Sequence, residues 1–306
     1  MADNRFPRHL LKPRHWPTWL GFGMWYLLAQ LPYRLQWKCA NVLAPLLRRN
    51  KKRLKYARRN LELCFPEKSD AEREQLLNDN IASTAMTVFE TGIAWFWPKW
   101  RFKKLYTVSG LEHLEQAQQD GQGALLLSLH FTTLEIGTAL LGQEADFDGM
   151  YRPHGNAVYD YIQRQRRQRH TQDAIAIPRE GVRTMITRLR KGHFIWYAPD
   201  RDLGDKNSLF VPFFGVPAAT VSATGKIISM GRAKVIPFSQ YRLPDGKGYE
   251  LVIHPPFEHF PTGDDYEDTL RVNQFMEKEI RKHPAQYFWA QPRFKSRPEG
   301  ESPLYS

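Results

Sequence analysis

The segment Ala124-Leu-Leu-Leu-Ser-Leu-His130-Phe-Thr-Thr-Leu-Glu135 contains the strongest indication of the fold class in this sequence. Its first part, residues 124–129, is almost entirely apolar, which is typical of a strand buried on both faces of a parallel sheet. The residues from Thr132 to about Leu141 predict a helix instead. His130 therefore falls at a strand-to-helix junction, where open α/β sheets bind their ligands.

The second feature of this stretch is the spacing between His130 and Glu135. On one continuous helix, residues i and i+5 lie roughly 140° apart and cannot touch. With His130 in the turn and Glu135 in the helix, the carboxylate can reach back to the imidazole, fix its tautomer and make the other ring nitrogen a better base. A histidine that caps the helix beside a solvated glutamate fits the spacing as well, so both interpretations stay open.

Composition and motifs narrow the chemistry. The chain has 306 residues, 42% of them hydrophobic, which suffices for one large domain or two small ones. The two cysteines, Cys39 and Cys64, form neither a metal-binding spacing nor a disulfide framework and indicate a reducing compartment. The sequence contains no G-x-S-x-G, H-E-x-x-H, C-x-x-C or Walker A motif. We therefore expect neither a metal nor a cofactor.

The positive charge is concentrated at the N-terminus. The net charge is +12, yet residues 1–60 hold 14 Lys and Arg against a single acidic residue, whereas residues 61–306 hold 30 basic and 31 acidic residues. A neutral body with a basic N-terminal segment indicates an anionic surface as partner, rather than general nucleic-acid binding.

The N-terminal segment also contains an 18-residue stretch without charge, Trp16 to Tyr33. As a helix it would be about 27 Å long, slightly less than the hydrocarbon core of a bilayer, and aromatic residues at both ends suit the membrane interface. We predict a membrane-anchoring helix that spans the bilayer or lies in its plane. A helix buried in the protein core is the alternative.

A basic run follows at residues 48–59, where eight of twelve residues are Lys or Arg. Each cation near an anionic membrane contributes about 1 kcal/mol, so the run predicts contact with lipid headgroups, with RNA binding as the competing interpretation. Ten cations follow the uncharged stretch and four precede it, up to residue 59. The positive-inside rule then places the body on the cytoplasmic side.

The body of the chain alternates between predicted helices and strands. Ser69 and Glu72 form a capping box that starts a long helix ending near Trp97, with Glu90 inside its apolar region. Glu90 is either solvated or the buried partner of an arginine. The other predicted helices are 156–170, 182–189 and 265–282, and the other strands are 149–153, 194–198, 234–238 and 249–254. This alternation indicates an α/β sandwich.

Several blocks of the sequence resemble the late, or secondary, acyltransferases of lipid A biosynthesis, and most closely their lauroyl/palmitoleoyl branch. The H-x4-D/E motif at His130 is shared with glycerolipid acyltransferases, whereas the remaining blocks are longer and more specific. These blocks are Arg59–Glu67, Glu90–Pro98, Tyr151–Pro153, Trp196–Asp200 and Arg293–Gly300. The resemblance implies a glycerolipid-acyltransferase-like mixed sheet flanked by helices, with an N-terminal membrane anchor over residues 1–46 and a catalytic domain over 47–306.

The resemblance also implies a reaction. A fatty acyl chain, lauroyl or similar, moves from acyl carrier protein to the hydroxyl of a 3-hydroxyacyl chain on Kdo2-lipid IVA, at the cytoplasmic face of the inner membrane. Acyl carrier protein, Kdo2-lipid IVA and membrane lipids are the expected partners, and nucleic acid is not. A different membrane glycolipid or a lysophospholipid is the alternative acceptor. A non-enzymatic membrane or RNA adaptor is the third interpretation.

The family's motifs suggest roles for six residues. His130 would be the general base on the acceptor hydroxyl, and Glu135 would orient the imidazole. Arg152 would hold an acceptor phosphate or the thioester oxyanion, unless it forms an ion pair in the sheet. Asp200 would pair with Arg152 or support the site. Two further residues would contact the acceptor, Asn60 and Arg59.

The chain departs from the family pattern in its C-terminal tail. Members often carry a His-Arg pair before the Arg-Phe-Lys block, and Gln291 and Pro292 stand there in this sequence. The resemblance therefore does not carry the family's substrate contacts over to this tail.

Overall fold

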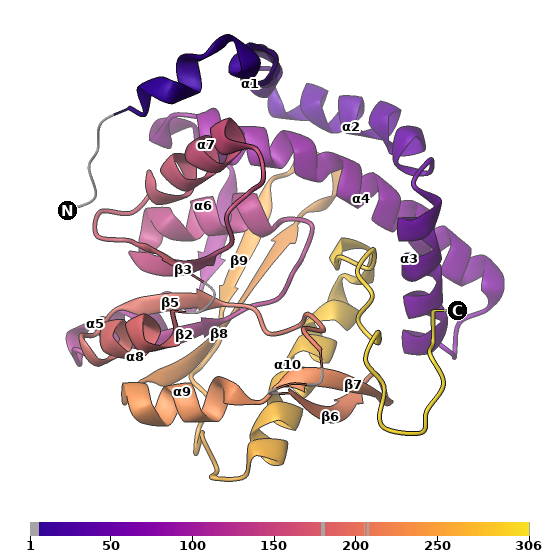
Figure 1. Ribbon diagram of the computed structural model, residues 1–306, viewed down its shortest axis with the longest axis vertical. Coiled ribbons are helices and arrows are strands. Elements are labelled where there is room, and N and C mark those ends of the chain that lie inside the picture. The colour runs from indigo at the N-terminus through magenta and orange to yellow at the C-terminus, as the bar shows by residue number, and fades with distance from the viewer. Residues whose placement is uncertain (1–5, 179–180, 205, 207, 306) are drawn as a thin grey trace.

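A seven-stranded mixed sheet flanked by helices forms the centre of the protein in a computed structural model, which describes residues 6–178, 181–204, 206 and 208–305 (Figure 1). The strand order is β1-β9-β8-β2-β5-β3-β4. Five strands, from β8 to β4 in that order, run parallel, and β9 and β1 run in the opposite direction. The strands are β1 Tyr106–Ser109, β2 Ala124–Leu127, β3 Phe147–Tyr151, β4 Ala176–Pro178, β5 Phe194–Tyr197, β8 Lys234–Arg242 and β9 Tyr249–Ile253.

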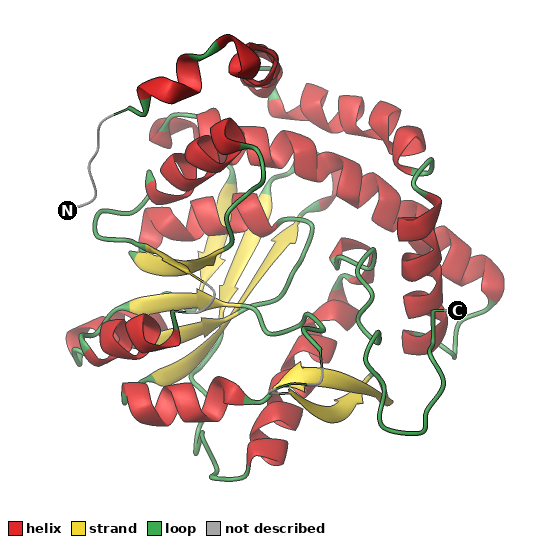
Figure 2. Ribbon diagram, in the orientation of Figure 1, coloured by secondary structure: helices red, strands yellow, loops and turns green. Residues whose placement is uncertain are grey.

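Helices cover both faces of this sheet (Figure 2). One face packs against α1, α5, α6, α7 and the end of α4, and the other against α3, α8, α9, α10 and the start of α4. The helices are α1 Trp16–Ala29, α2 Tyr33–Leu47, α3 Lys51–Cys64, α4 Asp70–Phe96, α5 Glu112–Gln119, α6 Leu134–Glu144, α7 Ala157–Gln168, α8 Val182–Arg190, α9 Ala223–Gly231 and α10 Asp265–Lys282. Short 3₁₀ helices are Arg8–Leu11, Pro13–His15, Lys99–Arg101, Pro244–Gly246 and Pro284–Gln286.

The strand β2 shows why an unbroken apolar run was needed at 124–127. Successive side chains of a strand point to opposite faces, so Leu125 and Leu127 join the core on the α8–α10 side, whereas Ala124 and Leu126 join the core on the α6–α7 side. All four residues are buried, and β2 pairs with parallel neighbours on both edges. The prediction of a central parallel strand followed by a helix is therefore confirmed.

The predicted long helix is confirmed as α4, and its capping box is present. The Ser69 hydroxyl accepts a hydrogen bond from the Glu72 backbone N–H at 3.3 Å, and the Glu72 carboxylate accepts one from the Ser69 N–H at 2.8 Å. The helix ends at Phe96, before Pro98. The sequence did not predict β1, β4, α5, α9 or the antiparallel hairpin of β6 (Ser208–Phe213) and β7 (Val216–Val221).

The prediction of one N-terminal anchoring helix over residues 16–33 is not supported. The stretch is divided: α1 ends at Ala29, and α2 begins at Tyr33 after Pro32, whose ring and missing N–H interrupt the helix. In the described part of the chain, no helix is both long and apolar enough to cross a membrane. Residues 1–5 of the predicted anchor lie outside the described residues.

The two N-terminal helices pack along the outer side of α4 instead (Figure 1). The indole N–H of Trp25 donates to the Val88 carbonyl at 2.9 Å, and Phe22 stacks on Trp95. Farther along, Ala40 of α2 is buried against α4. The basic run at 48–59 falls largely in α3, whose N-cap is Asn50, and most of its cations are exposed.

Candidate active site

The centre of the site lies at the carboxyl ends of two neighbouring parallel strands. The register of β2 and β5 pairs Ala124 with Phe194 and Leu127 with Tyr197. His130 and Asp200 each follow three residues after the last pair, so the chain brings them to the same edge of the sheet. This is the edge at which α/β proteins bind ligands.

Asp200 binds His130 through both of its carboxylate oxygens. The ring Nδ1 of His130 lies 2.6 Å from Oδ1 of Asp200, and the backbone N–H of His130 donates to Oδ2 at 3.0 Å. Asp200 is fully buried, whereas 24% of the His130 side chain is exposed. The His130 ring also lies nearly perpendicular to the Trp196 ring, with ring centroids 6.2 Å apart. One carboxylate therefore fixes both the ring and the backbone of the histidine.

The protonation of this pair follows from its electrostatics. Burial disfavours the charged carboxylate, but the charge of His130 and the hydrogen bonds from its ring and backbone outweigh burial and hold the pKa of Asp200 at about 2. An ionised carboxylate can only accept hydrogen bonds, so Nδ1 carries the proton of the neutral imidazole. The other ring nitrogen, Nε2, then holds a free lone pair and can take a proton.

The expected contact between Glu135 and His130 is wrong, because both groups have other partners. Nε of Arg167 donates to the Glu135 carboxylate at 3.1 Å, and Nη2 of Arg167 closes the ion pair. The indole N–H of Trp95 donates to the other oxygen of Glu135, also at 3.1 Å. Since α6 begins at Leu134, Glu135 stands in its first turn and points toward α4 and α7 rather than back to the imidazole.

A cavity of about 620 Å³ lies beside His130, and Glu135 and Arg152 also line it. Four further arginines and several apolar side chains complete its wall. The arginines are Arg53, Arg164, Arg167 and Arg201, and the apolar residues include Leu134, Phe147, Met150, Ile175, Trp196 and Phe288. The cavity thus combines a basic rim with apolar space, which suits an amphipathic anionic ligand.

The arginines of the cavity differ in how they are compensated. Arg167 is paired with Glu135. Within the described residues, no carboxylate forms an ion pair with Arg53, Arg152, Arg164 or Arg201. Of the two roles expected for Asp200, pairing with Arg152 is wrong, because Asp200 binds His130, whereas support of the site stays a prediction. Unpaired guanidinium groups beside a cavity favour phosphate or carboxylate ligands.

Asn60 and Arg59 contact the C-terminal segment, and neither is among the residues that line the cavity. The buried amide of Asn60 donates to the carbonyl oxygens of Trp289 and Gln291 at 2.8 and 2.7 Å. Arg59 donates to the Leu304 carbonyl at 3.1 Å. These contacts give both residues a role in holding the C-terminal segment on α3.

Glu90 is the buried partner of an arginine, which decides between the two interpretations of the sequence. Both of its oxygens accept from Arg242, at 2.6 and 2.7 Å, and the hydroxyl of Tyr249 donates to it at 2.7 Å.

In the described residues, no cluster of three or more His, Cys, Asp or Glu side chains is arranged to hold a metal ion.

Sequence reasoning missed the partners of the two motif residues, Asp200 for His130 and Arg167 for Glu135. A signal for the first existed. The apolar runs 124–127 and 194–197 are each followed, three residues farther on, by a polar residue, His130 or Asp200. The signal for Arg167 was its place in a basic helix, 156–170, next to a predicted site.

Comparison with known proteins identifies the class of enzyme as an acyltransferase. The chain belongs to the bacterial lipid A biosynthesis acyltransferase family, whose model matches residues 4–296. It is 43% identical over 304 residues to a lipid A biosynthesis lauroyltransferase of Escherichia coli (strain K12), with 98% of both chains covered. It is 39% identical over 306 residues to a lipid A biosynthesis palmitoleoyltransferase of the same strain, again with 98% of both covered.

A lipid A biosynthesis acyltransferase of Haemophilus influenzae (strain ATCC 51907 / DSM 11121 / KW20 / Rd) is 41% identical over 305 residues, which cover 98% of this chain and 96% of the relative. The predicted resemblance to the lauroyl/palmitoleoyl branch is confirmed. The protein is thus an acyltransferase of late lipid A biosynthesis, and the non-enzymatic adaptor is excluded.

Proposed function

We propose that this protein transfers a lauroyl or similar fatty acyl chain from acyl carrier protein to the hydroxyl of a 3-hydroxyacyl chain on Kdo2-lipid IVA. The observation that carries the proposal is the pair of His130 and Asp200 beside an arginine-rich cavity, since the pair supplies a base and the cavity suits an anionic lipid. The lipid A family supplies the class of acceptor.

In the proposed mechanism, His130 acts as the general base. Its Nδ1–H is held by Asp200, so Nε2 removes the proton from the acceptor hydroxyl as the oxygen attacks the thioester carbonyl. The tetrahedral intermediate collapses as the C–S bond breaks, and the imidazolium returns its proton to the leaving thiolate. Asp200 stabilises the transient imidazolium through its negative charge, as the carboxylate of a catalytic triad does.

Glu135 has a different role in this proposal. It neutralises Arg167 and ties α6 to α7 and α4, which shapes the cavity wall next to His130. The arginines that lack an ion pair among the described residues bind the charged parts of the substrates. Arg152 holds an acceptor phosphate or the thioester oxyanion, and Arg53, Arg164 and Arg201 add positive charge around the rim. The apolar wall accommodates acyl chains.

The test is an acyl-transfer assay with the full chain in detergent, with Kdo2-lipid IVA and C10–C16 acyl carrier proteins. We expect a product heavier by one acyl chain, and His130→Ala, in folded form, should give less than a few per cent of it. Absence of product with every donor would contradict the proposed substrates. Activity on lysophosphatidic acid alone would favour the lysophospholipid alternative. Normal activity of His130→Ala would exclude the general-base role.

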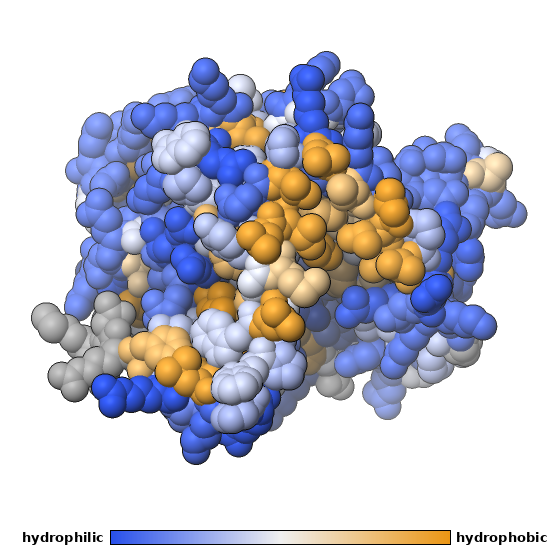
Figure 3. Space-filling model, turned by 90° about the horizontal axis from the view of Figure 1, so that it is seen from above, coloured by the Kyte–Doolittle hydropathy of each residue, from blue (hydrophilic) through white to orange (hydrophobic). Residues whose placement is uncertain are grey.

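We further propose that α1 and α2 bind the cytoplasmic face of the inner membrane by lying in its plane. The inward sides of the two helices are packed on the body, whereas their outward sides expose hydrophobic residues (Figure 3). These exposed residues include Leu20, Met24, Leu27, Leu28, Leu35, Val42 and Leu46. Basic residues stand beside them, Arg34, Lys38, Arg48 and Arg49. An apolar face with flanking cations is typical of helices that lie at a lipid surface.

The cavity adjoins the same side of the molecule, which supports this arrangement. Leu47, the last residue of α2, lines the cavity together with Val88 of α4. Val88 is 46% exposed. An acceptor dissolved in the membrane would therefore reach His130 past α2 and α4, without leaving the lipid surface entirely.

Co-sedimentation with vesicles of phosphatidylethanolamine and phosphatidylglycerol tests the membrane proposal. We expect the wild type to sediment with the vesicles and Leu20→Glu/Leu27→Glu to stay in solution while still acylating acceptor dispersed in detergent. Val182→Glu, at an exposed apolar position of α8, is the matched control. Equal sedimentation of the double variant and the control would contradict the proposed surface.

A further inference from the structure

The turn that carries His130 is held from two sides by elements distant in sequence. The Thr132 N–H donates to the Gln286 carbonyl at 2.7 Å, and the Phe288 N–H donates to the His130 carbonyl at 3.0 Å. From the other side, the Thr87 hydroxyl of α4 donates to the Thr132 carbonyl at 2.9 Å. The placement of the imidazole therefore depends on how α4 and the segment around residue 286 are fixed.

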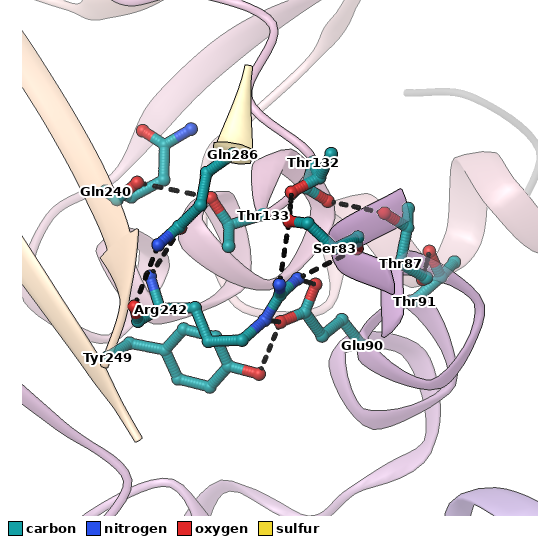
Figure 4. Close-up of polar contacts among 10 residues, drawn as sticks. All are labelled: Ser83, Thr87, Glu90, Thr91, Thr132, Thr133, Gln240, Arg242, Tyr249 and Gln286. Atoms are coloured by element: carbon teal, nitrogen blue, oxygen red, sulfur yellow. Dashed lines mark hydrogen bonds and ion pairs between the residues drawn. The ribbon is translucent and has the colours of Figure 1, made fainter. Parts of the chain in front are cut away.

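Arg242, the last residue of β8, lies behind this turn and is fixed in place (Figure 4). Its guanidinium makes a two-pronged ion pair with Glu90 of α4, and the hydroxyl of Tyr249 binds the same carboxylate. Both charges are buried. Because the pair is mutually compensated and planar, the guanidinium has one orientation, and its remaining N–H groups point in defined directions.

One of those N–H groups begins a chain of hydrogen bonds that ends on the turn. Nη1 of Arg242 donates to the Ser83 hydroxyl at 2.9 Å, and this hydroxyl lies 2.7 Å from the hydroxyl of Thr132 (Figure 4). A guanidinium can only donate, so the proton of Ser83 is free to bind Thr132. The positive charge also polarises the Ser83 hydroxyl and strengthens it as a donor.

Arg242 is also connected to the opposite side of the turn, through Gln286. Its backbone N–H donates to Oε1 of Gln286 at 2.8 Å, and the amide of Gln286 donates back to its carbonyl at 2.9 Å. The carbonyl of Gln286 is the group that receives the Thr132 N–H. A single buried residue thus connects to Thr132 twice, through Ser83 and through Gln286.

We propose that Arg242 and Ser83 are positioning residues, which fix the catalytic turn through Thr132 and thereby aim the His130 imidazole at the acceptor hydroxyl. This inference rests on the proposed general-base role of His130. Neither Arg242 nor Ser83 is among the residues that line the cavity, so neither is placed to bind substrate. Their removal should change the rate of the chemical step rather than substrate affinity.

Ser83→Ala and Thr132→Val test this proposal, because each removes one hydroxyl and leaves the ion pair intact. Loss of one hydrogen bond used to aim a reacting group predicts an approximately tenfold lower kcat for each variant. We expect unchanged KM values for acyl carrier protein and acceptor in Ser83→Ala, whose site lies outside the cavity lining, and thermal unfolding of both variants close to that of the wild type. Thr132→Ser, which keeps the hydroxyl, should restore most of kcat.

The double variant Ser83→Ala/Thr132→Val distinguishes a shared contact from two separate effects. Both single changes break the same hydrogen bond. We therefore expect the kcat of the double variant to be no lower than that of the less active single variant. Arg242→Lys keeps a cation for Glu90 but lacks the planar fork, and should lower kcat to a similar extent. Thr91→Val is the control, because the Thr91 hydroxyl bonds the Thr87 carbonyl of its own helix.

The possible results separate this inference from the proposed function. An inactive His130→Ala together with unchanged kcat in Ser83→Ala and Thr132→Val would overturn the positioning role alone. An active His130→Ala would overturn the general base and this inference with it. Raised KM at unchanged kcat, or losses that follow thermal unfolding and are not restored by Thr132→Ser, would also overturn the positioning role.

Discussion

At the scale of single residues, the most consequential contact is the double hydrogen bond from His130 to Asp200. The carboxylate selects the Nδ1–H tautomer, and at the same time it holds the backbone of the turn. The bond lies within the sheet edge rather than within the H-x4-E motif. The motif residue Glu135 pairs with Arg167 instead, and His130 pairs with a residue seventy positions farther along the chain.

Asp200→Asn should reduce kcat roughly 10³–10⁴-fold, by analogy with loss of the carboxylate in a catalytic triad. The amide can donate to Nδ1 and so favour the tautomer with a protonated Nε2, which cannot accept a proton. Steady-state kinetics with saturating donor and acceptor measures the effect, with circular dichroism to verify folding. A loss below tenfold in the folded variant would exclude Asp200 as the residue that sets the tautomer.

Glu135→Gln and Arg167→Gln should have coupled effects on activity. Either change leaves one charge of the pair without compensation at the cavity wall, whereas the double change removes both charges. We therefore expect the double variant to be at least as active as the poorer single variant. The measurement is a double-mutant cycle in kcat/KM. Losses that multiply would show that Glu135 acts independently of Arg167.

At the scale of elements, α4 links the N-terminal helices, the sheet and the catalytic turn. One of its buried polar contacts is the ion pair of Glu90 with Arg242. The same helix carries an exposed ion pair, Glu74 with Arg58 of α3, at 3.0 Å. The two pairs allow burial to be compared on one helix.

Glu90→Ala should lower the free energy of unfolding by roughly 3–5 kcal/mol, because it leaves the Arg242 charge buried and unpaired. Glu74→Ala should cost no more than about 1 kcal/mol, since water screens the exposed pair. Urea denaturation followed by circular dichroism measures both. Similar losses for the two variants would mean that the buried pair is relieved by water or by movement of α4.

Long apolar or periodic elements were predictable from the sequence, and short ones were not. β2, β5, α4 and α10 combine a clear pattern with clear end signals. β4 has only three residues, too few for a pattern. The β6–β7 hairpin places Pro212 opposite Pro217, and prolines inside a run argue against a strand. The hairpin forms because it has just two strands and packs on α10.

The candidate site was predictable in position but not in connectivity. His130 was found because a buried strand ends just before it, and Asp200 was found for the same reason. Their contact depends on β2 and β5 being neighbours, which is a long-range property of the strand order. For the same reason the sequence leaves Asp200 open between pairing with Arg152 and supporting the site, and it does not identify Arg242 as the partner of Glu90.

At the scale of the whole molecule, two buried carboxylates connect stability to acidity. The interactions of Asp200 with His130 outweigh its burial and lower its pKa to about 2. Glu279 is also buried, and hydrogen bonds from His254, Lys282 and Tyr241 outweigh that burial and lower its pKa to about 2. A carboxyl with a lowered pKa stabilises the fold above its unfolded pKa, and this contribution disappears as pH falls toward the folded value.

The protein should therefore lose stability between about pH 4.5 and pH 2, with Asp200 contributing on the order of 2 kcal/mol of the loss. Thermal unfolding at a series of pH values checks this expectation. Asp200→Asn should be less stable than the wild type at pH 7 and should lose less on acidification. A parallel decline of wild type and variant over this range would contradict the contribution of Asp200.

The exposed apolar side of α1 and α2 also has a kinetic consequence. An enzyme held at a lipid surface meets a lipid acceptor in two dimensions, so its velocity follows the mole fraction of acceptor in that surface rather than the molarity in the sample. Diluting Kdo2-lipid IVA with inert phospholipid at constant total amount should slow the reaction. The soluble donor should keep an ordinary dependence on molarity. The velocity would then depend on the surface mole fraction of the acceptor and on the bulk molarity of the donor.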